Sequence, residues 1–298
     1  MNTIFDIAFN DEHAPLREAF HQAQQAAPAS TGAIQAFRTL ILHYYRHHKR
    51  DFAWRTHTTP YFVTVSEIML QQTQTHRVAG KFEAFVQALP DFATLAQAPT
   101  AEVIRLWKGL GYNRRALALQ KIAQRVTYEF GGVLPTETTT LETFPSIGKA
   151  TARSIITYAF NQPTTFIETN VRTVFIYFFF PNEAAVTDAQ LEPLVTAAVD
   201  THNPREWYYA LMDYGVMLKK TVGNVSRLSA HYAKQSKFEG SDRQIRGMIL
   251  QALLDQPGIP ADALPMILAK EPARVAKILA GLMQEGFIVE RNQLLWLA

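Results

Sequence analysis

Apolar side chains recur every three or four residues along most of the chain, which is the spacing of one face of an α-helix. The pattern begins near Ala33 and is clear in the segments IQAFRTLILHYYRHH, AEVIRLWKGLG and ALALQKIAQRVTYEF. Clusters of Gly, Pro and Thr such as GGVLPTETTT interrupt the pattern and mark turns between helices. The sequence therefore predicts an almost entirely helical body, an all-α fold.

Two stretches without this pattern divide the chain. The first thirty or so residues end in AAPASTG, and we expect residues 1–31 to form a loosely attached N-terminal arm. A polar passage, KKTVGNVSRLSAHYAKQSKFEGSDRQ, follows the helical body. We therefore expect an arm (1–31), a helical domain (32–236) and a minor C-terminal domain (237–298).

The C-terminal segment changes from helices to strands. Helical spacing covers Arg243–Leu254, Ala261–Ala269 and Glu271–Glu285, and Gly286 then precedes a short FIVERNQLLWLA hairpin. This order resembles a winged helix, which is a small α+β fold. Because so small a sheet is not stable without the helices beside it, we expect one compact domain.

Composition is typical of a globular protein with a packed interior. The chain has 298 residues, of which 48% are hydrophobic. No segment reaches the roughly 20 consecutive apolar residues of a spanning helix, and the first residues lack the layout of a signal peptide. We expect no membrane partner and a cytoplasmic location. The net charge of +3 and the pI near 9.0 permit a polyanionic partner.

The absence of cysteine excludes several kinds of site. Zero cysteines rule out disulfides, zinc–cysteine modules, thiolate-held iron–sulfur clusters and a cysteine nucleophile. His47 and His48 are adjacent on a predicted helix and so point in different directions, while His76 has no partner at ligand spacing. We therefore expect no metal site and no cofactor.

The stretch SEIMLQQTQTHR, from Ser66 to Arg77, combines apolar residues with one carboxylate and three glutamines. Read as one helix, it has an apolar stripe that can face a core. A second stripe carries an acid and long amides at i, i+3, i+4 and i+7 spacing. The first stripe contains Val65, Ile68, Met69 and Gln72, and the second contains Glu67, Leu70, Gln71 and Gln74.

Two further motifs lie downstream. TFPSIGKATARSI (143–155) contains a proline turn, a glycine where the backbone must bend or approach closely, and then a helix. Its amide N–H groups can bind a phosphate, with Lys149 adding charge. In TFIETNVRTVF (165–175), Glu168, Thr169 and Asn170 interrupt an apolar run, and Thr169 or Asn170 can cap the helix that follows.

Together these motifs resemble the helix-hairpin-helix DNA glycosylases, and most closely the adenine glycosylases of the MutY type. The resemblance covers roughly Phe37 to Met217. It implies two helical subdomains with a cleft between them, and double-stranded DNA with a mispaired or damaged base as the partner. The matching motifs are AWR (53–55), PYFVTVSEIMLQQTQ (60–74), LWKGLGYNRRA (106–116), FPSIGKATA (144–152), IETNVRTV (167–174) and ALMDYGVM (210–217).

The resemblance also implies roles for two carboxylates. Glu67 protonates a purine base that is turned out of the duplex, and partial burial beside Ile68 and Leu70 would raise its pKa for that task. The alternative is an ordinary surface glutamate. Glu168 occupies the position of a family aspartate that stabilises the cationic sugar. The longer side chain shifts the carboxylate by roughly 1 Å, a misplacement that can reduce the rate about 10²-fold.

Other residues are expected to contact the DNA. Gln71 and Gln72 fill or read the gap in the duplex, a role that the helical phase favours for Gln71. Tyr112 wedges near the mispair or packs as an ordinary turn tyrosine, and Asn113 stands where the family usually has a second tyrosine. The remaining candidates are Arg55 at the pocket or a phosphate, Ser146, Gly148, Lys149 and Thr151 at a phosphate, and Asn170 either orienting its segment or capping a helix.

Three departures from the family limit the expectation. Ala150 stands where bifunctional relatives carry a Schiff-base lysine, so we expect hydrolysis without strand cleavage. Lys219 stands at the first position of the family's four-cysteine loop, so that cluster cannot form. We also expect no NUDIX-like domain of the kind that reads 8-oxoguanine in the family, because the winged-helix-like segment takes its place.

The expected function is base excision repair by a monomeric, clusterless glycosylase that removes adenine opposite 8-oxoguanine or guanine. Three alternatives stay open: a glycosylase for a mismatched pyrimidine or a modified base, a damage-binding protein that has lost its chemistry, and strand cleavage at abasic sites by Lys149.

Overall fold

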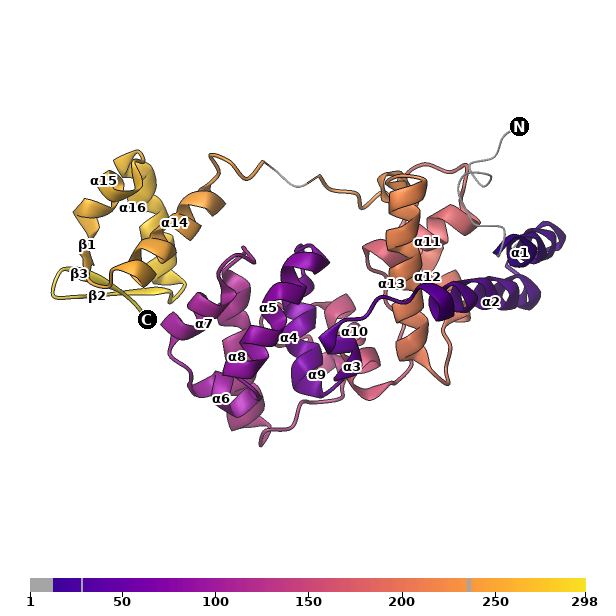
Figure 1. Ribbon diagram of the computed structural model, residues 1–298, viewed down its shortest axis with the longest axis horizontal. Coiled ribbons are helices and arrows are strands. Elements are labelled where there is room, and N and C mark those ends of the chain that lie inside the picture. The colour runs from indigo at the N-terminus through magenta and orange to yellow at the C-terminus, as the bar shows by residue number, and fades with distance from the viewer. Residues whose placement is uncertain (1–12, 28, 235–236) are drawn as a thin grey trace. The chain divides into compact units, whose positions relative to one another are not determined.

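The chain forms two compact units, and each unit combines two separate stretches of sequence (Figure 1). The computed structural model describes residues 13–27, 29–234 and 237–298. The first unit comprises the chain up to Thr58 together with Gly148–Lys234, and the second comprises Thr59–Ile147 together with Gln235–Ala298. The C-terminal segment, predicted as a separate domain, thus groups with residues 59–147.

The first unit is helical and packs around aromatic rings. Its core lies where α11 meets α13 and where α13 meets α2. The ring of Phe37 lies 5.1 Å from that of Phe175 and 5.8 Å from that of Trp207, edge to face in both pairs. Its elements are α1 (Ala14–Ala26), α2 (Thr31–His48), α3 (Ala53–Thr56), α10 (Lys149–Phe160), α11 (Thr169–Phe179), α12 (Asp188–Ala198), α13 (Pro204–Thr221) and the 3-10 helix η3 (Val225–Leu228).

The predicted N-terminal arm contains a packed helix, α1, which lies on α2 (Figure 1). Phe20 of α1 is fully buried, and its ring lies 5.2 Å from Phe178 and 6.0 Å from Phe37. Burying a phenylalanine side chain stabilises a fold by roughly 1.5–3 kcal/mol. The expectation of a loose arm is therefore wrong for Ala14–Ala26, because one buried ring gives too weak a periodic signal to detect. Residues 1–12 lie outside the described residues.

The first part of the second unit is a set of six helices. The closest pairs are α6 with α8, α4 with α5, and α7 with α8. Fully buried Phe82, Phe85 and Trp107 occupy its interior. Its elements are α4 (Pro60–Leu70), α5 (Thr75–Ala88), α6 (Phe92–Gln97), α7 (Thr100–Trp107), α8 (Arg114–Glu129) and α9 (Thr138–Leu141).

The C-terminal part of the second unit has the helix-then-strand order predicted from sequence. Its sheet is antiparallel with the order β1-β3-β2, and Asn292 and Gln293 form the β2–β3 turn with φ values of 52° and 63°. The hairpin is confirmed; β1 was not predicted because two residues carry no periodic signal. The elements are α14 (Asp242–Asp255), β1 (Ile259–Pro260), η4 (Ala261–Ala263), α15 (Leu264–Leu268), α16 (Pro272–Gln284), β2 (Ile288–Arg291) and β3 (Leu294–Leu297).

Candidate functional site

Glu67 is a half-buried carboxylate on a helix whose other side chains are mostly buried. Helix α4 starts where the side chain of Thr59 accepts a hydrogen bond from the Phe62 amide at 3.2 Å, and Pro60 occupies its first turn. Ile68 and Met69 beside Glu67 are fully buried. A carboxylate in this setting lies at the edge of an apolar core, where it can contact a ligand and remain shielded from bulk water.

Helix α4 ends at Leu70, so the predicted helix from Ser66 to Arg77 is too long. Gln72 has a left-handed backbone with φ 52° and an exposed side chain, which contradicts its predicted place on the apolar stripe. Gln71 caps the helix, and its Nε2 donates a hydrogen bond to the carbonyl oxygen of Ser146 at 2.9 Å. The structure thus joins two of the predicted DNA-binding segments through a direct contact.

Arg115 holds the loop that follows α4 in place. The sequence did not predict this role. Its Nη1 donates to the carbonyl oxygens of Ile68 (2.9 Å), Met69 (3.0 Å) and Gln71, which are left open where α4 ends. Its Nη2 donates to the Thr73 hydroxyl at 2.9 Å. Burial lowers the pKa of Arg115 to about 10, so the guanidinium stays charged at neutral pH. The sequence feature that could have predicted this role is an arginine at the start of a helix, next to a glycine turn.

Tyr112 lies in a tight turn between α7 and α8. Gly109 and Gly111 have φ values of 95° and 74°, and Tyr112 itself has φ 48°. The indole Nε1 of Trp107 donates to the carbonyl oxygen of Gly111 at 3.0 Å, and the Arg115 guanidinium lies 5.3 Å from the Tyr112 ring centroid. The turn is therefore held in one conformation that presents a half-buried tyrosine.

The FPSIGK turn carries its unusual backbone at Ser146, not at Gly148. Ser146 has φ 63°, whereas Gly148 has φ −97° and open space where a Cβ would lie. The prediction that the glycine meets a bend or a close approach is wrong for the DNA-free chain. Gly148 is the N-cap of α10, and no side chain of the described residues caps this helix. Exposed Lys149 opens its first turn, an arrangement suited to an anion.

Glu168 caps helix α11, the role that the sequence offered to Thr169 or Asn170. Its Oε1 accepts hydrogen bonds from the amides of Asn170 (2.6 Å) and Val171 (2.9 Å), and its Oε2 accepts one from Asn170 Nδ2 at 3.3 Å. Burial raises the pKa of Glu168, and the hydrogen bonds from the two amides oppose that rise. When ionised, a carboxylate held at a helix N-terminus can stabilise a nearby cation.

Helices α11 and α13 approach closely at Asn170. A Cβ on Gly215 would lie 2.7 Å from Asn170 Cβ, 2.9 Å from Asn170 O and 3.0 Å from Asn170 Cα. Only glycine fits there. The glycine within ALMDYGVM thus sets the position of the segment that carries Glu168.

Arg55, predicted at the pocket or a phosphate, binds a buried carboxylate, and its contact with DNA stays a prediction. Its Nη1 and Nη2 donate to Asp213 Oδ2 and Oδ1, both at 2.9 Å, and its guanidinium lies 4.5 Å from the Tyr209 ring centroid. Arg50 binds the same carboxylate at 2.6 Å. Because Asp213 is 1% exposed at its side chain, Arg55 serves to neutralise a buried charge. The lone aspartate in the apolar run ALMDYGVM was the signal for this network.

The segment after α13 does not fit the family's iron–sulfur cluster. The chain supplies no thiolate, and residues 218–232 run LKKTVGNVSRLSAHY. The segment is tied down by backbone hydrogen bonds instead, from Val186 N to Leu228 O and from Ala230 N to Val186 O, both at 2.9 Å. Over the described ranges, no group of three or more His, Asp or Glu residues is placed to hold a metal ion. No helix there is long and apolar enough to span a membrane.

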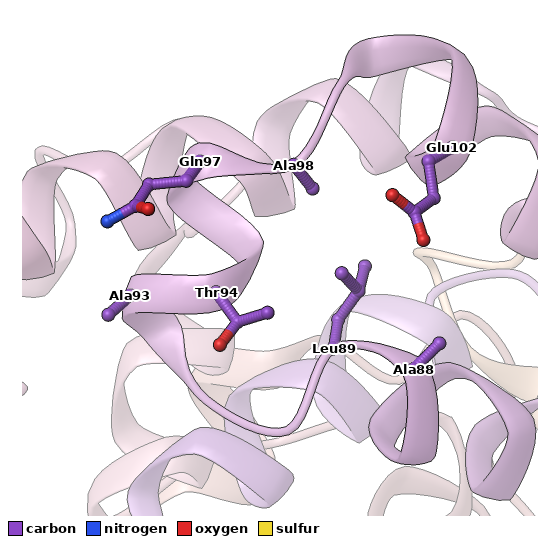
Figure 2. A pocket seen from close by; sticks show the side chains of 7 residues that line it. All are labelled: Ala88, Leu89, Ala93, Thr94, Gln97, Ala98 and Glu102. Carbon is purple, nitrogen blue, oxygen red and sulfur yellow. The ribbon is translucent and has the colours of Figure 1, made fainter.

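A surface hollow of about 350 Å³ in the second unit holds none of the predicted site residues (Figure 2). Glu102 is its one charged side chain. The lining residues are Ala88, Leu89, Ala93, Thr94, Gln97, Ala98 and Glu102. Its polar groups are one carboxylate, one amide (Gln97) and one hydroxyl (Thr94), with no second charged group for the carboxylate to act with.

Comparison with known proteins gives consistent matches. Residues 65–202 match the HhH-GPD superfamily base excision DNA repair protein family. The chain is 30% identical to the adenine DNA glycosylase of Mycolicibacterium smegmatis over 273 residues, which cover 83% of this chain and 91% of that protein. It is 35% identical to the adenine DNA glycosylase of Mus musculus over 245 residues, 78% of this chain and 46% of that protein.

Solved structures agree with these matches. A thermostable thymine-DNA glycosylase aligns with a TM-score of 0.56 and 25% identity over 62% of this chain and 86% of its own. A trapped endonuclease III–DNA covalent intermediate aligns with a TM-score of 0.50 and 15% identity over 63% and 85% of the two chains, which is a likeness of fold.

Proposed function

Because the chain belongs to the HhH-GPD superfamily of base excision DNA repair proteins, we propose that it is a DNA glycosylase that releases adenine from a mispair with 8-oxoguanine or guanine. One observation carries the choice of base: the alignment with an adenine DNA glycosylase extends over 91% of that relative. The chain spans about half of the mouse relative, so the remaining half of that protein has no counterpart in the match.

Two carboxylates perform the proposed chemistry. Glu67 donates a proton to a ring nitrogen of the flipped adenine, so that the base leaves with the electron pair of the glycosidic bond. The sugar becomes an oxocarbenium-like cation, which the Glu168 carboxylate stabilises. Water then adds to C1′ and loses a proton, which leaves an abasic site. The α11 amides that bind Glu168 favour its ionised form, as this role requires.

The proposed DNA contacts come from three loops. The uncapped start of α10, with Gly148, Lys149 and Thr151, binds a backbone phosphate. Gln71 and Gln72 lie next to the FPSIGK turn and occupy the gap left by the flipped base, and Tyr112 wedges beside the mispair. Asn170 orients Glu168 through its own side-chain amide.

The proposed enzyme is a clusterless monomer that cleaves only the glycosidic bond. Ala150 removes the lysine that a Schiff-base mechanism would need at that position. The location we propose is the cytoplasm of a bacterial-type cell, in association with the nucleoid DNA. A glycosylase for another base is the second candidate, favoured by Glu168 at the position where the family has an aspartate. A DNA-binding protein without chemistry is disfavoured, because pure binding has no need of Glu67.

The test is a single-turnover assay on duplexes that carry A opposite 8-oxoguanine, A opposite G, T opposite G or U opposite G. Alkali reveals abasic sites, and borohydride traps any covalent lysine intermediate. Adenine release without trapping supports the proposal. Release of another base selects the second candidate, and trapping on Lys149, lost in Lys149→Ala, selects strand cleavage. Tight binding with no release from any duplex selects the binding protein.

A further inference from the structure

The side chain of Tyr112 is held by a residue from the C-terminal part of the same unit. Arg243, in the first turn of α14, donates a hydrogen bond from Nη1 to the Tyr112 hydroxyl at 2.6 Å, and its guanidinium carbon lies 5.3 Å from the ring centroid. The hydroxyl is the atom of Tyr112 farthest from the backbone. This contact therefore fixes the direction of the side chain, which the turn alone does not fix.

A three-residue ionic bridge lies beside this contact. Glu285, at the end of α16, accepts hydrogen bonds from Arg114 at 2.8 and 2.6 Å and from Arg246 at 3.0 and 2.6 Å. The hydrogen bonds from Arg114, with those from Arg246, lower the pKa of Glu285 to about 2 against the opposing effect of burial. Arg114 follows the Tyr112 turn by two residues. The bridge thus ties the same turn to the C-terminal helices by a second, geometrically specific contact.

We propose that Arg243 is a positioning residue for Tyr112, and that the Arg114–Glu285–Arg246 bridge holds the C-terminal domain (237–298) on the Tyr112 turn. The domain thereby sets how Tyr112 meets the base opposite the one released. The role at the mispair rests on the proposed function, whereas the docking of the domain does not. If the domain had no part in positioning Tyr112, a contact with the phenol hydroxyl would not be needed.

The docking is tested in DNA-free protein by chemical crosslinking. The chain has no cysteine, so an Asn113→Cys, Gln284→Cys variant carries only two thiols, each next to a bridge residue. A short bismaleimide is expected to link them in high yield. Adding Glu285→Gln should lower the initial crosslinking rate about tenfold, since it removes charge-assisted hydrogen bonds. Adding Arg274→Ala, which breaks the ion pair with Asp242 inside the domain, should leave the rate unchanged. Equal rates in all three backgrounds would overturn the docking.

The positioning role is tested by single-turnover base release from duplexes with 8-oxoguanine or guanine opposite adenine. Arg243→Ala and Tyr112→Phe should each slow release about tenfold and change the ratio of the two rates by the same factor. The double variant should be no slower than either single variant. Arg243→Lys should recover part of the rate, because an ammonium can donate to the same hydroxyl.

Three results would overturn the positioning role. One is an Arg243→Ala variant that releases base at the wild-type rate and with the wild-type ratio of rates on the two duplexes. Another is a double variant in which the two losses multiply, since that would assign Arg243 a separate task such as a phosphate contact. The third is a wild type that releases no base, which would refute the proposed function, while the crosslinking rates would still decide the docking.

Discussion

Glu168 combines a structural and a chemical task in one carboxylate. Oε1 takes both amide hydrogen bonds of the α11 cap, while Oε2 receives the longer bond of 3.3 Å from Asn170. The oxygen that faces a sugar cation in the proposed mechanism is therefore Oε2. The sequence identified Glu168 from its motif but assigned the cap to a neighbour, because Asn and Thr are common N-cap residues.

The raised pKa of Glu168 predicts a pH dependence. Burial disfavours the charged form, so the fold is most stable with Glu168 protonated and loses that contribution as pH rises through the raised pKa. The proposed mechanism needs the charged form. The single-turnover rate should therefore rise with pH on its acid limb, with a midpoint above the usual glutamate range. The pH–rate profile of the Glu168→Gln variant should lack this acid limb. An acid limb that is unchanged in that variant would mean that another group causes it.

The geometry of the FPSIGK turn predicts different effects on stability at Ser146 and at Gly148. Ser146→Gly removes the strain of a left-handed backbone and should raise the free energy of unfolding by about 0.5–1 kcal/mol. Gly148→Ala should leave stability nearly unchanged, because its Cβ would meet open space. If a phosphate approaches α10 at Gly148, the same alanine weakens DNA binding. Urea unfolding and fluorescence anisotropy measure the two effects, and undiminished affinity in Gly148→Ala would place the phosphate elsewhere.

At the scale of elements, helix α4 shows where sequence periodicity fails. The predicted helix ran on through the polar residues 71–77, yet α4 ends at Leu70, and Arg115 binds the carbonyl oxygens of Ile68 and Met69 that a further turn would have used. That contact joins residues more than forty positions apart in the sequence. Periodicity contains only local information, so it predicted the existence of α4 correctly and its end incorrectly.

Arg115→Lys is expected to loosen the loop after α4. A single ammonium cannot reach all the acceptors that the guanidinium spans, so buried carbonyl oxygens lose their partners. The free energy of unfolding should fall by about 2–3 kcal/mol, and base release should slow as Gln71 and Gln72 lose their positions. The exposed Arg105 provides the control, since Arg105→Lys should change neither value. Wild-type stability in Arg115→Lys would contradict this account of the loop.

The close approach of α11 and α13 gives a second element-scale prediction. Gly215→Ala places a Cβ 2.7–3.0 Å from backbone and side-chain atoms of Asn170. The helices must separate, and the free energy of unfolding should fall by about 1–3 kcal/mol. Gly247→Ala in α14 is the matched control, because its Cβ meets no atom within 4 Å. That change should stabilise the helix by about 0.5–1 kcal/mol. Equal stability of the two variants in urea unfolding would contradict the packing argument.

At the scale of the whole molecule, the sequence predicted the helical body and, β1 apart, the C-terminal order of helices and hairpin strands. It did not predict that Thr59–Ile147 and Gln235–Ala298 form one unit, nor the Asp213 network with Arg50 and Arg55. Both depend on contacts between distant segments, which leave no periodic trace. The candidate residues of the loops could be predicted because their motifs are local, whereas the bond from Arg55 to Asp213 could not, because the two residues are 158 positions apart.

The central claim is that Glu67 and Glu168 act together to release adenine from a mispaired duplex. Its most direct test is the single-turnover rate on A opposite 8-oxoguanine for the wild type, Glu67→Gln and Glu168→Asp, with folding checked by circular dichroism. The account predicts release by the wild type, none by Glu67→Gln, and release at least as fast by Glu168→Asp. Adenine release by Glu67→Gln at the wild-type rate would contradict it.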